Sequence, residues 1–365
     1  MLVSAQLSSA AAPPVEVVPA RDRSEYLAWQ RVLGVYPISR WFLAAGVARY
    51  QAEALRRYQQ PLAPLAAGAH RVLWQAPTLP TPPSAGQLAN WLRPGQDVPL
   101  SPGQLDQLFG AHAPAFLVDT ASVADWIAAP VLERGGPGAD SSRPQVYVSL
   151  SHTRFGGVLL PQLLYEIWFS ERPSRHGLDP YAGRLDGLIW RVTLGLDGRV
   201  LAYDSIHPCG CYHMVFPAQA LRRKAALSGD APLVLGEPLG DGPLAVQLSA
   251  GEHQILRVLP LAEASADDRR GLRLLPYSAL QNVRATGGGS GSLFGAHGLV
   301  VGSERGERWW LWMSGVRSPG AMRDLGRHAT AFVGQRHFDD PHWLDELFEP
   351  IAWPADAAHT ASLPE

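Results

Sequence analysis

The spacing of apolar residues is helical in the first third of the chain and strand-like afterwards. In residues 22–60, Tyr26, Trp29 and Leu33 recur every three to four positions, which is the period of an amphipathic helix. Pro37 interrupts this pattern, because a proline disfavours helical backbone in the residue before it. The segment therefore predicts two helices packed as a hairpin, and we prefer this interpretation to a membrane or partner role.

Residues 61–145 show weaker patterns and many turn-forming residues. Short helices are predicted at Ser84–Leu92, Ser101–Phe109 and Ala121–Ala129. The stretch Glu133–Pro144 combines Gly, Pro, Asp and Ser, a composition typical of a surface linker. We therefore place a domain boundary there.

Strand patterns dominate after residue 145. Residues 145–151 alternate between faces, and 163–169 form an apolar run of strand length. The dipeptide Asp197-Gly198 lies between two strand patterns, 188–194 and 199–204, and predicts a β-hairpin. Further strands are expected at Cys211–Phe216, Pro232–Leu235, Leu244–Leu248, His253–Leu259, Gly298–Val301 and Trp309–Met313, and short helices after Pro217 and Ser318.

These elements predict an α+β protein, with a mostly antiparallel β-sandwich or partial barrel and an N-terminal helical and irregular region. The expected organisation is a disordered segment or leader remnant in 1–20, a helical and irregular region in 21–140, a β-rich domain in 145–350 and a tail in 351–365. The first 14 residues end in small residues, as the cleavage end of a signal peptide does. They lack the basic and fully apolar parts of a signal peptide. The location is periplasmic if a leader has been truncated, and otherwise cytoplasmic.

Composition narrows the function only slightly. The formal net charge of the 365 residues is −2, which gives no electrostatic basis for binding nucleic acid. No run of about twenty apolar residues exists, so no transmembrane segment is expected. The sequence leaves the oligomeric state and the identity of a small-molecule or peptide substrate open.

Both cysteines of the chain lie in one short stretch, Ser205–His213, with a histidine on either side. On an extended strand, His207, Cys209, Cys211 and His213 would share one face. Six residues of strand span about 20 Å, so the two histidines cannot bind one tetrahedral ion unless the chain turns.

Two residues favour a turn, because Pro208 fixes its own φ and Gly210 tolerates a positive φ. Cys209 and Cys211 would then converge on one ion, with a flanking histidine as third ligand. Thiolate and imidazole ligands suit zinc best among the common ions, with copper or iron as alternatives.

Other residues would complete such a site. His253 is a further candidate metal ligand, and His152 and Glu166 are candidate catalytic proton carriers. Glu166 is a lone carboxylate in an apolar strand. It must be paired or protonated if it faces inward, and on a half-exposed strand it faces water, which is the interpretation we favour.

The loop Ser170–Gly187 is rich in charged residues. Arg172, Arg184 and Asp186 are candidate substrate-binding residues, because arginine binds carboxylate or phosphate groups through two hydrogen bonds. The alternative is a solvated loop with local ion pairs.

Three functions remain open. The first hypothesis is a metalloenzyme, either a hydrolase or an oxidoreductase, whose ion activates water or a substrate oxygen. The second is a thiol–disulfide redox protein that uses the Cys209–Cys211 pair. The third is a non-enzymatic binding protein of the cell envelope, with Trp309, Trp310 and Trp312 on its surface; in that case both cysteines are small core residues.

Overall fold

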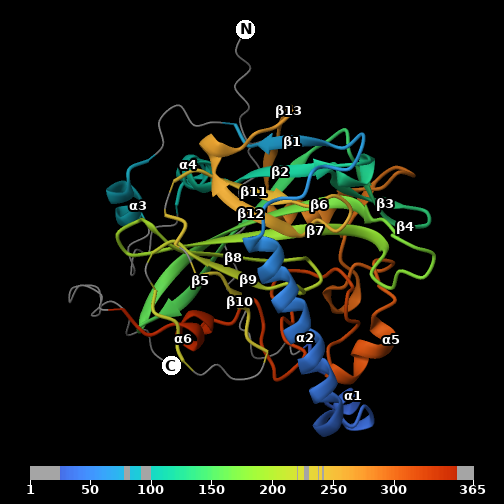
Figure 1. Cartoon of the computed structure of the whole chain (residues 1–365). Coiled ribbons are helices and arrows are strands. Elements are labelled where there is room, and N and C mark those ends of the chain that lie inside the picture. The colour runs from blue at the N-terminus through green and yellow to red at the C-terminus, as the bar shows by residue number, and fades with distance from the viewer. Residues whose placement is uncertain are drawn as a thin grey trace.

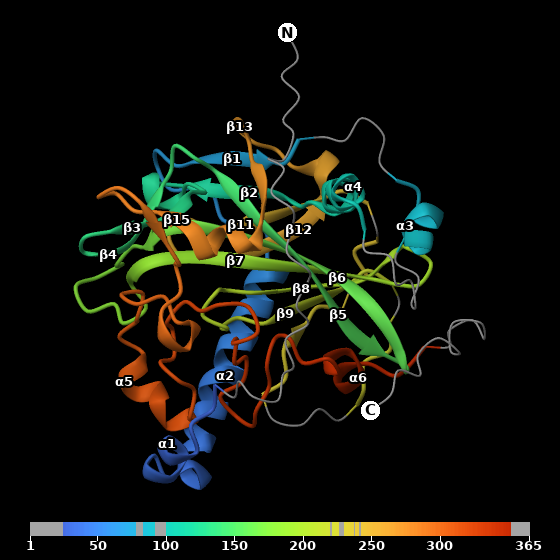
Figure 2. The ribbon, with the colours of Figure 1, turned by 180° about the vertical axis from the view of Figure 1, so that it is seen from behind.

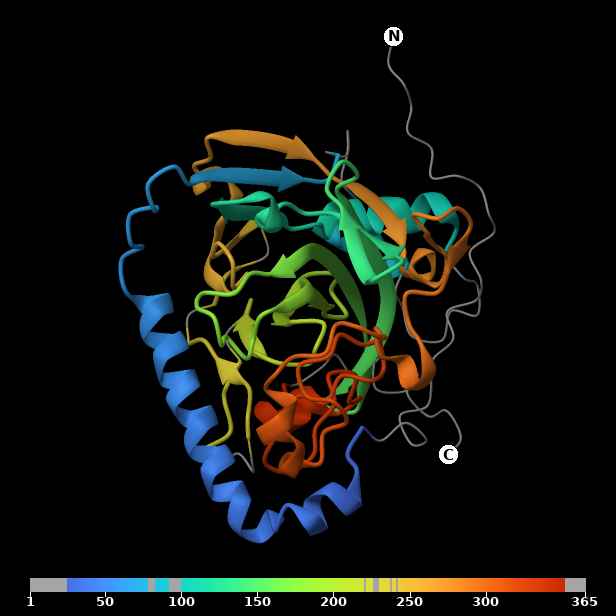
Figure 3. The same ribbon diagram turned by 90° about the vertical axis from the view of Figure 1, so that its right-hand side faces the viewer.

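The computed structural model describes residues 25–77, 83–91, 100–219, 221–225, 230–236, 238–240 and 242–351. Two β-sheets and an irregular C-terminal segment form three layers, and helix α2 (Tyr36–Gln59) runs along one side of them (Figure 1, Figure 3). This arrangement confirms the predicted α+β class with a sheet-rich body. The predictions for residues 1–20 and for nearly all of the tail lie outside the described residues.

The first layer is a five-stranded sheet in the order β12-β11-β2-β1-β13. Two of its strands, β1 and β2, come from the region that the sequence predicted to be irregular, and that prediction was wrong. Each contains a run of only three or four apolar residues without a period, which pattern alone cannot separate from a loop or a buried helix. The strands are β1 (His70–Gln75), β2 (Ala115–Thr120), β11 (Leu244–Leu248), β12 (Ile255–Pro260) and β13 (Asp268–Gly271).

The second layer is a seven-stranded sheet in the order β10-β9-β8-β7-β6-β5-β14. Strands β5 to β9 form an antiparallel meander, and the predicted hairpin is confirmed: the Gly195 amide donates to the Arg199 carbonyl at 2.8 Å across its turn. The strands are β5 (Gln145–Phe155), β6 (Val158–Arg172), β7 (Gly183–Leu194), β8 (Val200–Ile206), β9 (Met214–Pro217), β10 (Leu233–Val234) and β14 (Arg273–Pro276).

The main hydrophobic core lies between the two sheets. Alternate residues of a strand point to opposite faces, so Tyr165 and Phe169 of β6 enter this core while Glu166 and Trp168 point the other way. In a two-layer sandwich that other face would be wet. Here the C-terminal segment covers it, and Trp168 is fully buried.

The C-terminal segment contains mostly short turns of helix and small bridges. The strands predicted at Gly298–Val301 and Trp309–Met313 and the helix predicted after Ser318 are wrong, because runs of tryptophan and glycine-rich turns carry no period. Its elements are η4 (Tyr277–Asn282), β15 (Val283–Arg284), β16 (Ser290–Gly291), η5 (Ala296–Gly298), α5 (Arg308–Leu311), η6 (Trp312–Ser314) and α6 (Trp343–Leu347).

The remaining elements test the other local predictions. The two helices predicted in residues 22–60 are confirmed, and so are the helices near residues 84 and 101. The stretch predicted as a linker is instead a β-hairpin, and only a single 3-10 turn lies within 121–129. No helix follows Pro217 within the described residues 217–219 and 221–225. The elements are α1 (Ala28–Leu33), α3 (Ala85–Trp91), α4 (Pro102–His112), η2 (Val123–Asp125), β3 (Ala129–Glu133), β4 (Gly136–Asp140) and η3 (Leu261–Glu263).

Candidate functional site

The antiparallel meander brings four strand ends to one edge of the seven-stranded sheet. Strand β6 ends at Arg172, β7 begins at Gly183, β8 ends at Ile206 and β9 begins at Met214. The loops that join them therefore meet at this edge. From the other sheet, the turn between β11 and β12 adds His253 to the same place.

A chain of alternating carboxylates and imidazoles lies at the centre of this edge. His207 Nδ1 is 3.2 Å from one oxygen of Asp186, and His253 Nδ1 is 2.9 Å from the other. His253 Nε2 forms a second ion pair with Asp125 at 3.3 Å. All four side chains are at least 97% buried. The structure thus joins Asp186, His207 and His253, which the sequence singled out separately.

The charges of these carboxylates and imidazoles stabilise one another. Burial alone would lower the pKa of His253, but hydrogen bonds and charge from Asp125 and Asp186 outweigh burial and raise it. Burial would likewise raise the pKa of Asp186, yet His207 and His253 hold it well below its usual range. The His253 ring also stacks on Phe169, with ring centroids 3.8 Å apart. The geometry therefore favours a charged imidazolium between two carboxylates.

The backbone is strained at the same edge. Six described non-glycine residues have a left-handed φ, and three of them lie here: Leu185 at 53°, Tyr212 at 64° and His253 at 52°. Each left-handed residue of this kind costs about 1–2 kcal/mol. Such strain persists where surrounding contacts fix the chain, and it is concentrated at functional sites in known proteins.

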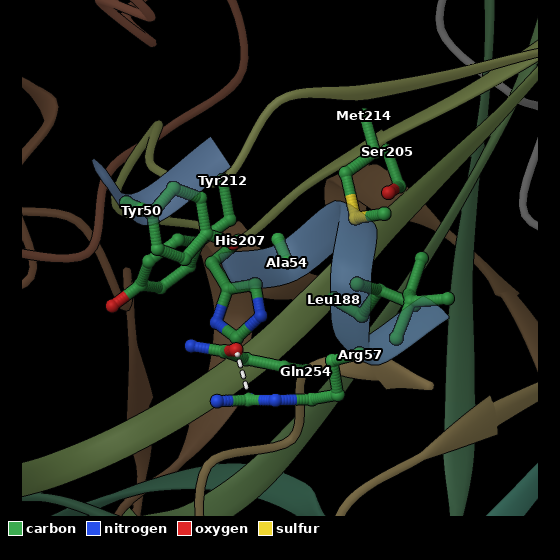
Figure 4. A pocket seen from close by; sticks show the side chains of 10 residues that line it. Tyr50, Ala54, Arg57, Leu188, Ser205, His207, Tyr212, Met214 and Gln254 are labelled. Atoms are coloured by element: carbon green, nitrogen blue, oxygen red, sulfur yellow. Dashed lines mark hydrogen bonds between the residues drawn. The ribbon is translucent and has the colours of Figure 1, made fainter. Parts of the chain in front are cut away.

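A small pocket opens beside the chain of carboxylates and imidazoles. Figure 4 shows the imidazole of His207 facing it, with the rings of Tyr50 and Tyr212 alongside. These two tyrosine rings are 4.9 Å apart, and Arg57 of α2 closes another side by donating to Gln254 at 2.9 Å. The pocket has room for about one water molecule. Helix α2 therefore forms one wall of the site.

The candidate substrate-binding arginine Arg172 is held by groups of the protein itself. Its guanidinium forms a buried ion pair with Glu252 at 3.0 Å and a hydrogen bond to the Tyr212 hydroxyl at 3.3 Å. These bonds fix Tyr212 beside the pocket. Arg172 thus positions Tyr212 and Glu252.

The two cysteines lie at the end of β8, in a turn that brings them together. The Gly210 amide donates to the His207 carbonyl at 2.8 Å, and the His207 amide donates to the Cys211 carbonyl at 3.0 Å. The Cys211 amide donates to the Cys209 sulfur at 3.4 Å. Gly210 has a φ of 90°, and a Cβ there would collide with the Ala329 carbonyl. Both thiols are free.

Charged residues surround this thiol pair. The hydrogen bond to Cys209 raises the pKa of the Cys211 thiol well above its usual value, and burial adds to the shift. The fully buried guanidinium of Arg323 opposes that shift. Burial raises the pKa of nearby Glu307 to about 7. The Cys211 thiol therefore favours its protonated form.

No protein-family model, curated protein or solved structure matches this chain. The geometry of the site is therefore the basis on which its function is inferred.

The structure separates the predicted metal ligands into different environments. His213 points away from the thiols and lies 3.0 Å from Asp204, which also binds Arg191 through two hydrogen bonds of 2.8 and 2.6 Å. His207 and His253 are engaged with carboxylates of the chain at the sheet edge. In the part of the chain that the structure describes, no three His, Cys, Asp or Glu side chains are grouped to hold a metal ion.

Two other predicted site residues lie elsewhere. His152 pairs with Pro161 near the beginning of β6, at the opposite end from the site. Arg184 is half-exposed and contacts Glu133 and the Pro137 carbonyl of the β3–β4 hairpin. Neither side chain reaches the thiols or the buried histidines.

Glu166 lies in the middle of β6, and the interpretation that it faces water is wrong. The C-terminal segment covers it, leaving the residue 2% exposed. Neither carboxylate oxygen has a hydrogen-bond partner among the described residues. Burial raises its pKa well above the usual value and so favours the protonated form of Glu166.

Sequence reasoning missed several residues of the site. Asp125 ends a single 3-10 turn, and Glu252 precedes His253 in a short turn. Glu307 lies in a charged stretch of sequence, which is typical of a solvent-exposed segment. Tyr212 is the only one with a sequence signal, because it lies between Cys211 and His213 in the conspicuous stretch.

Proposed function

We propose that the protein is a thiol–disulfide redox protein whose centre is the Cys209–Cys211 pair. The observation that carries the proposal is the turn at His207–Cys211, which holds two free cysteines close together, with the Cys211 amide donating to the Cys209 sulfur at 3.4 Å. Two thiols held together can form a disulfide with little loss of chain entropy. They are also the only cysteines of the chain, so the pair has no competing partner within it.

The two sulfurs differ in exposure and in hydrogen bonding, which suggests different roles. Cys211 is the more exposed of the two, and Cys209 is 7% exposed. The Cys209 sulfur accepts the hydrogen bond of the Cys211 amide, and the buried guanidinium of Arg323 lies nearby. Access decides which sulfur of a disulfide a partner thiolate attacks. Cys211 is therefore the attacked sulfur and Cys209 the leaving one.

The reaction oxidises two thiols of a partner, which is a small thiol or a protein dithiol. A partner thiolate attacks the Cys211 sulfur of the intramolecular disulfide, the Cys209–Cys211 bond breaks, and Cys209 leaves as thiolate. A second partner thiolate attacks the partner sulfur of the mixed disulfide, releasing the oxidised partner and Cys211, which takes up a proton. Two electrons pass from two thiols to the protein, and the reverse sequence reduces a disulfide.

The test is equilibration with mixtures of reduced and oxidised glutathione, followed by acid quenching and intact mass measurement. The native protein is expected to interconvert between dithiol and intramolecular disulfide with little mixed disulfide. Cys209→Ser is expected to accumulate glutathione on Cys211, because the sulfur that would displace the glutathione is gone. Cys211→Ser is expected to react more slowly, because Cys209 is buried. Equal inertness of the native protein and both variants would refute the proposal.

The metal-centre hypothesis stays a prediction that a parallel measurement decides. Elemental analysis of the native protein and of the Cys209→Ser/Cys211→Ser double variant compares bound zinc, copper and iron. About one ion per native chain, lost in the double variant, would favour two thiolate ligands of a metal over a redox pair. The redox proposal expects no stoichiometric metal in either protein.

A further inference from the structure

One end of the molecule exposes an unusual number of large apolar side chains. It is formed by α1, the first half of α2 and α5, which lie together at the lower end in Figure 2. We call this surface the apolar tip. Nine large apolar residues there are between 42% and 76% exposed: Trp29, Val32, Leu33, Val35, Ile38, Trp41, Phe42, Trp309 and Trp310.

The tip is firmly built into the fold. The Leu27 amide donates to the Gly315 carbonyl at 2.6 Å, and Arg31 Nε donates to the Ser314 carbonyl at 2.7 Å. A Cβ on Gly34 would come within 2.6 Å of Met313, so the two segments are in close contact. The exposed residues therefore lie on two segments that are far apart in the sequence and pack against each other.

The exposed side chains follow helix faces. In α2, Ile38, Trp41 and Phe42 lie three and four positions apart and share one face. Helix α1 has no buried residue at all. The apolar side chains that predicted a packed hairpin are thus exposed in α1 and in the first half of α2. The prediction that they are packed was wrong. Exposed apolar patches of this extent mark interaction sites.

The charge of the tip indicates what it contacts. Residues 26–52 contain Arg31, Arg40 and Arg49 but no aspartate or glutamate. The guanidinium of Arg40 lies 5.1 Å from the ring of Trp41, and that of Arg308 lies 4.8 Å from the ring of Trp309. Tryptophan and arginine together favour the boundary between lipid headgroups and acyl chains.

We propose that the apolar tip docks on an anionic lipid bilayer, with its tryptophans and Phe42 inserted at the interface. Among the described residues no helix is both long and apolar enough to cross a bilayer, so docking would be peripheral. Arg49 lies seven residues beyond Phe42 on the same helix face, about 10 Å along the axis. That spacing places its charge at headgroup level when Phe42 is inserted.

The test is sedimentation of the full chain with vesicles of phosphatidylcholine alone or mixed with phosphatidylglycerol. The native protein is expected to bind the anionic vesicles and to dissociate as salt is added. Trp41→Ser/Phe42→Ser should weaken binding at least about tenfold. Arg40→Gln/Arg49→Gln should weaken it about 30-fold and flatten the salt dependence. Val123→Ser, an equally exposed apolar residue on η2, is the matched control and should bind like the native protein.

Two results would overturn the proposal. One is absence of native binding to anionic vesicles, or equal binding to both kinds of vesicle. The other is that the native protein binds no vesicles but forms a dimer in analytical ultracentrifugation, and that the Trp41→Ser/Phe42→Ser variant is a monomer. The tip would then be an interface between two copies of the chain. Apart from the control, the substituted side chains lie on the tip and along α2. A circular dichroism spectrum checks that each variant is folded.

Discussion

At the scale of single residues, Asp186 holds the site together. It is 2% exposed and lies against two histidines and, at 3.8 Å, the guanidinium of Arg305. Its sequence context, a charged loop next to a strand, drew attention to it as a substrate-binding residue. Its observed contacts are all internal, which makes it a residue that orients His207 and His253. An isolated charge in a low-dielectric interior is costly, so loss of Asp186 would leave its partners uncompensated.

Asp186→Asn is therefore expected to destabilise the protein by about 3–5 kcal/mol at pH 6, measured by urea unfolding. The pKa of Asp186 is lowered in the folded state, so its stabilisation is present above its unfolded pKa of about 4 and is lost as pH falls further. The pKa of His253 is raised, so its stabilisation is present below about 6.5 and is lost as pH rises through the folded value. The difference between native and variant should be largest between these limits.

The matched control for Asp186 is Asp268→Asn. Asp268 forms an exposed ion pair with Arg270, and such pairs contribute little to stability because solvent screens them. If Asp186→Asn cost no more than this control, the carboxylate–imidazole chain would not be a stabilising unit.

Glu307 gives the site a pH dependence near neutrality. Burial raises the pKa of Glu307 to about 7, above its usual 4.5, so the protein loses stability as the pH rises from about 4.5 through about 7. Glu307→Gln removes that loss. Between pH 6 and pH 8 the native protein should lose about 1 kcal/mol relative to the variant, measured by urea unfolding at both pH values. Parallel stability curves for the two proteins would show that Glu307 does not titrate in this range.

At the scale of elements, the turn at the end of β8 decides whether the two thiols meet. Gly210 permits it, with a φ of 90° and no space for a side chain against Ala329. Gly210→Ala is expected to destabilise the protein by about 1–3 kcal/mol and to slow disulfide formation between Cys209 and Cys211. Thermal unfolding and mass-detected oxidation measure the two effects.

Gly46→Ala is the control for that substitution. Gly46 lies in α2, and a Cβ added there would meet no neighbouring segment or side chain within 4 Å. Alanine at this position should therefore leave stability unchanged or raise it by up to about 1 kcal/mol. Equal effects of the two substitutions would mean that the turn tolerates a side chain, and the geometric basis of the thiol pair would fail.

Elements with a clear period were predictable from the sequence, and unpatterned ones were not. The β7–β8 hairpin follows from Asp197-Gly198 and its flanking strands, and α4 follows from Ser101 and Gln104, which form a capping box. Strand β2 is buried throughout, and its apolar run of four residues, 115–118, has no alternation to reveal it. The burial of Glu166 could not be predicted, because it depends on a segment more than one hundred residues later.

At the scale of the whole molecule, the site depends on contacts between distant parts of the chain. The candidate site includes the conspicuous stretch Ser205–His213, where Cys209, Cys211 and His207 lie. Its partners come from Asp125 in η2, His253 in the β11–β12 turn and Glu307 beside α5. No local pattern links these residues, because only the packing of the two sheets and the C-terminal segment brings them together.

The arrangement of the molecule also relates the two proposals. Helix α2 carries Ile38, Trp41 and Phe42 at the apolar tip and Tyr50 at the pocket beside His207 (Figure 1, Figure 4). Tyr50 lies eight residues beyond Phe42, about 12 Å along the helix. A bilayer-bound molecule would thus hold its thiol centre close to the membrane surface. Each proposal still stands on its own observation and has its own test.

The most direct test of the redox assignment is a count of free thiols in the unfolded chain, after reduction and again after mild oxidation of the folded protein. Because the chain has two cysteines, we expect two thiols after reduction and none after oxidation, with the oxidised protein still monomeric. Two thiols that persist after oxidation, or a disulfide that joins two chains, would contradict the assignment of Cys209 and Cys211 as a redox pair.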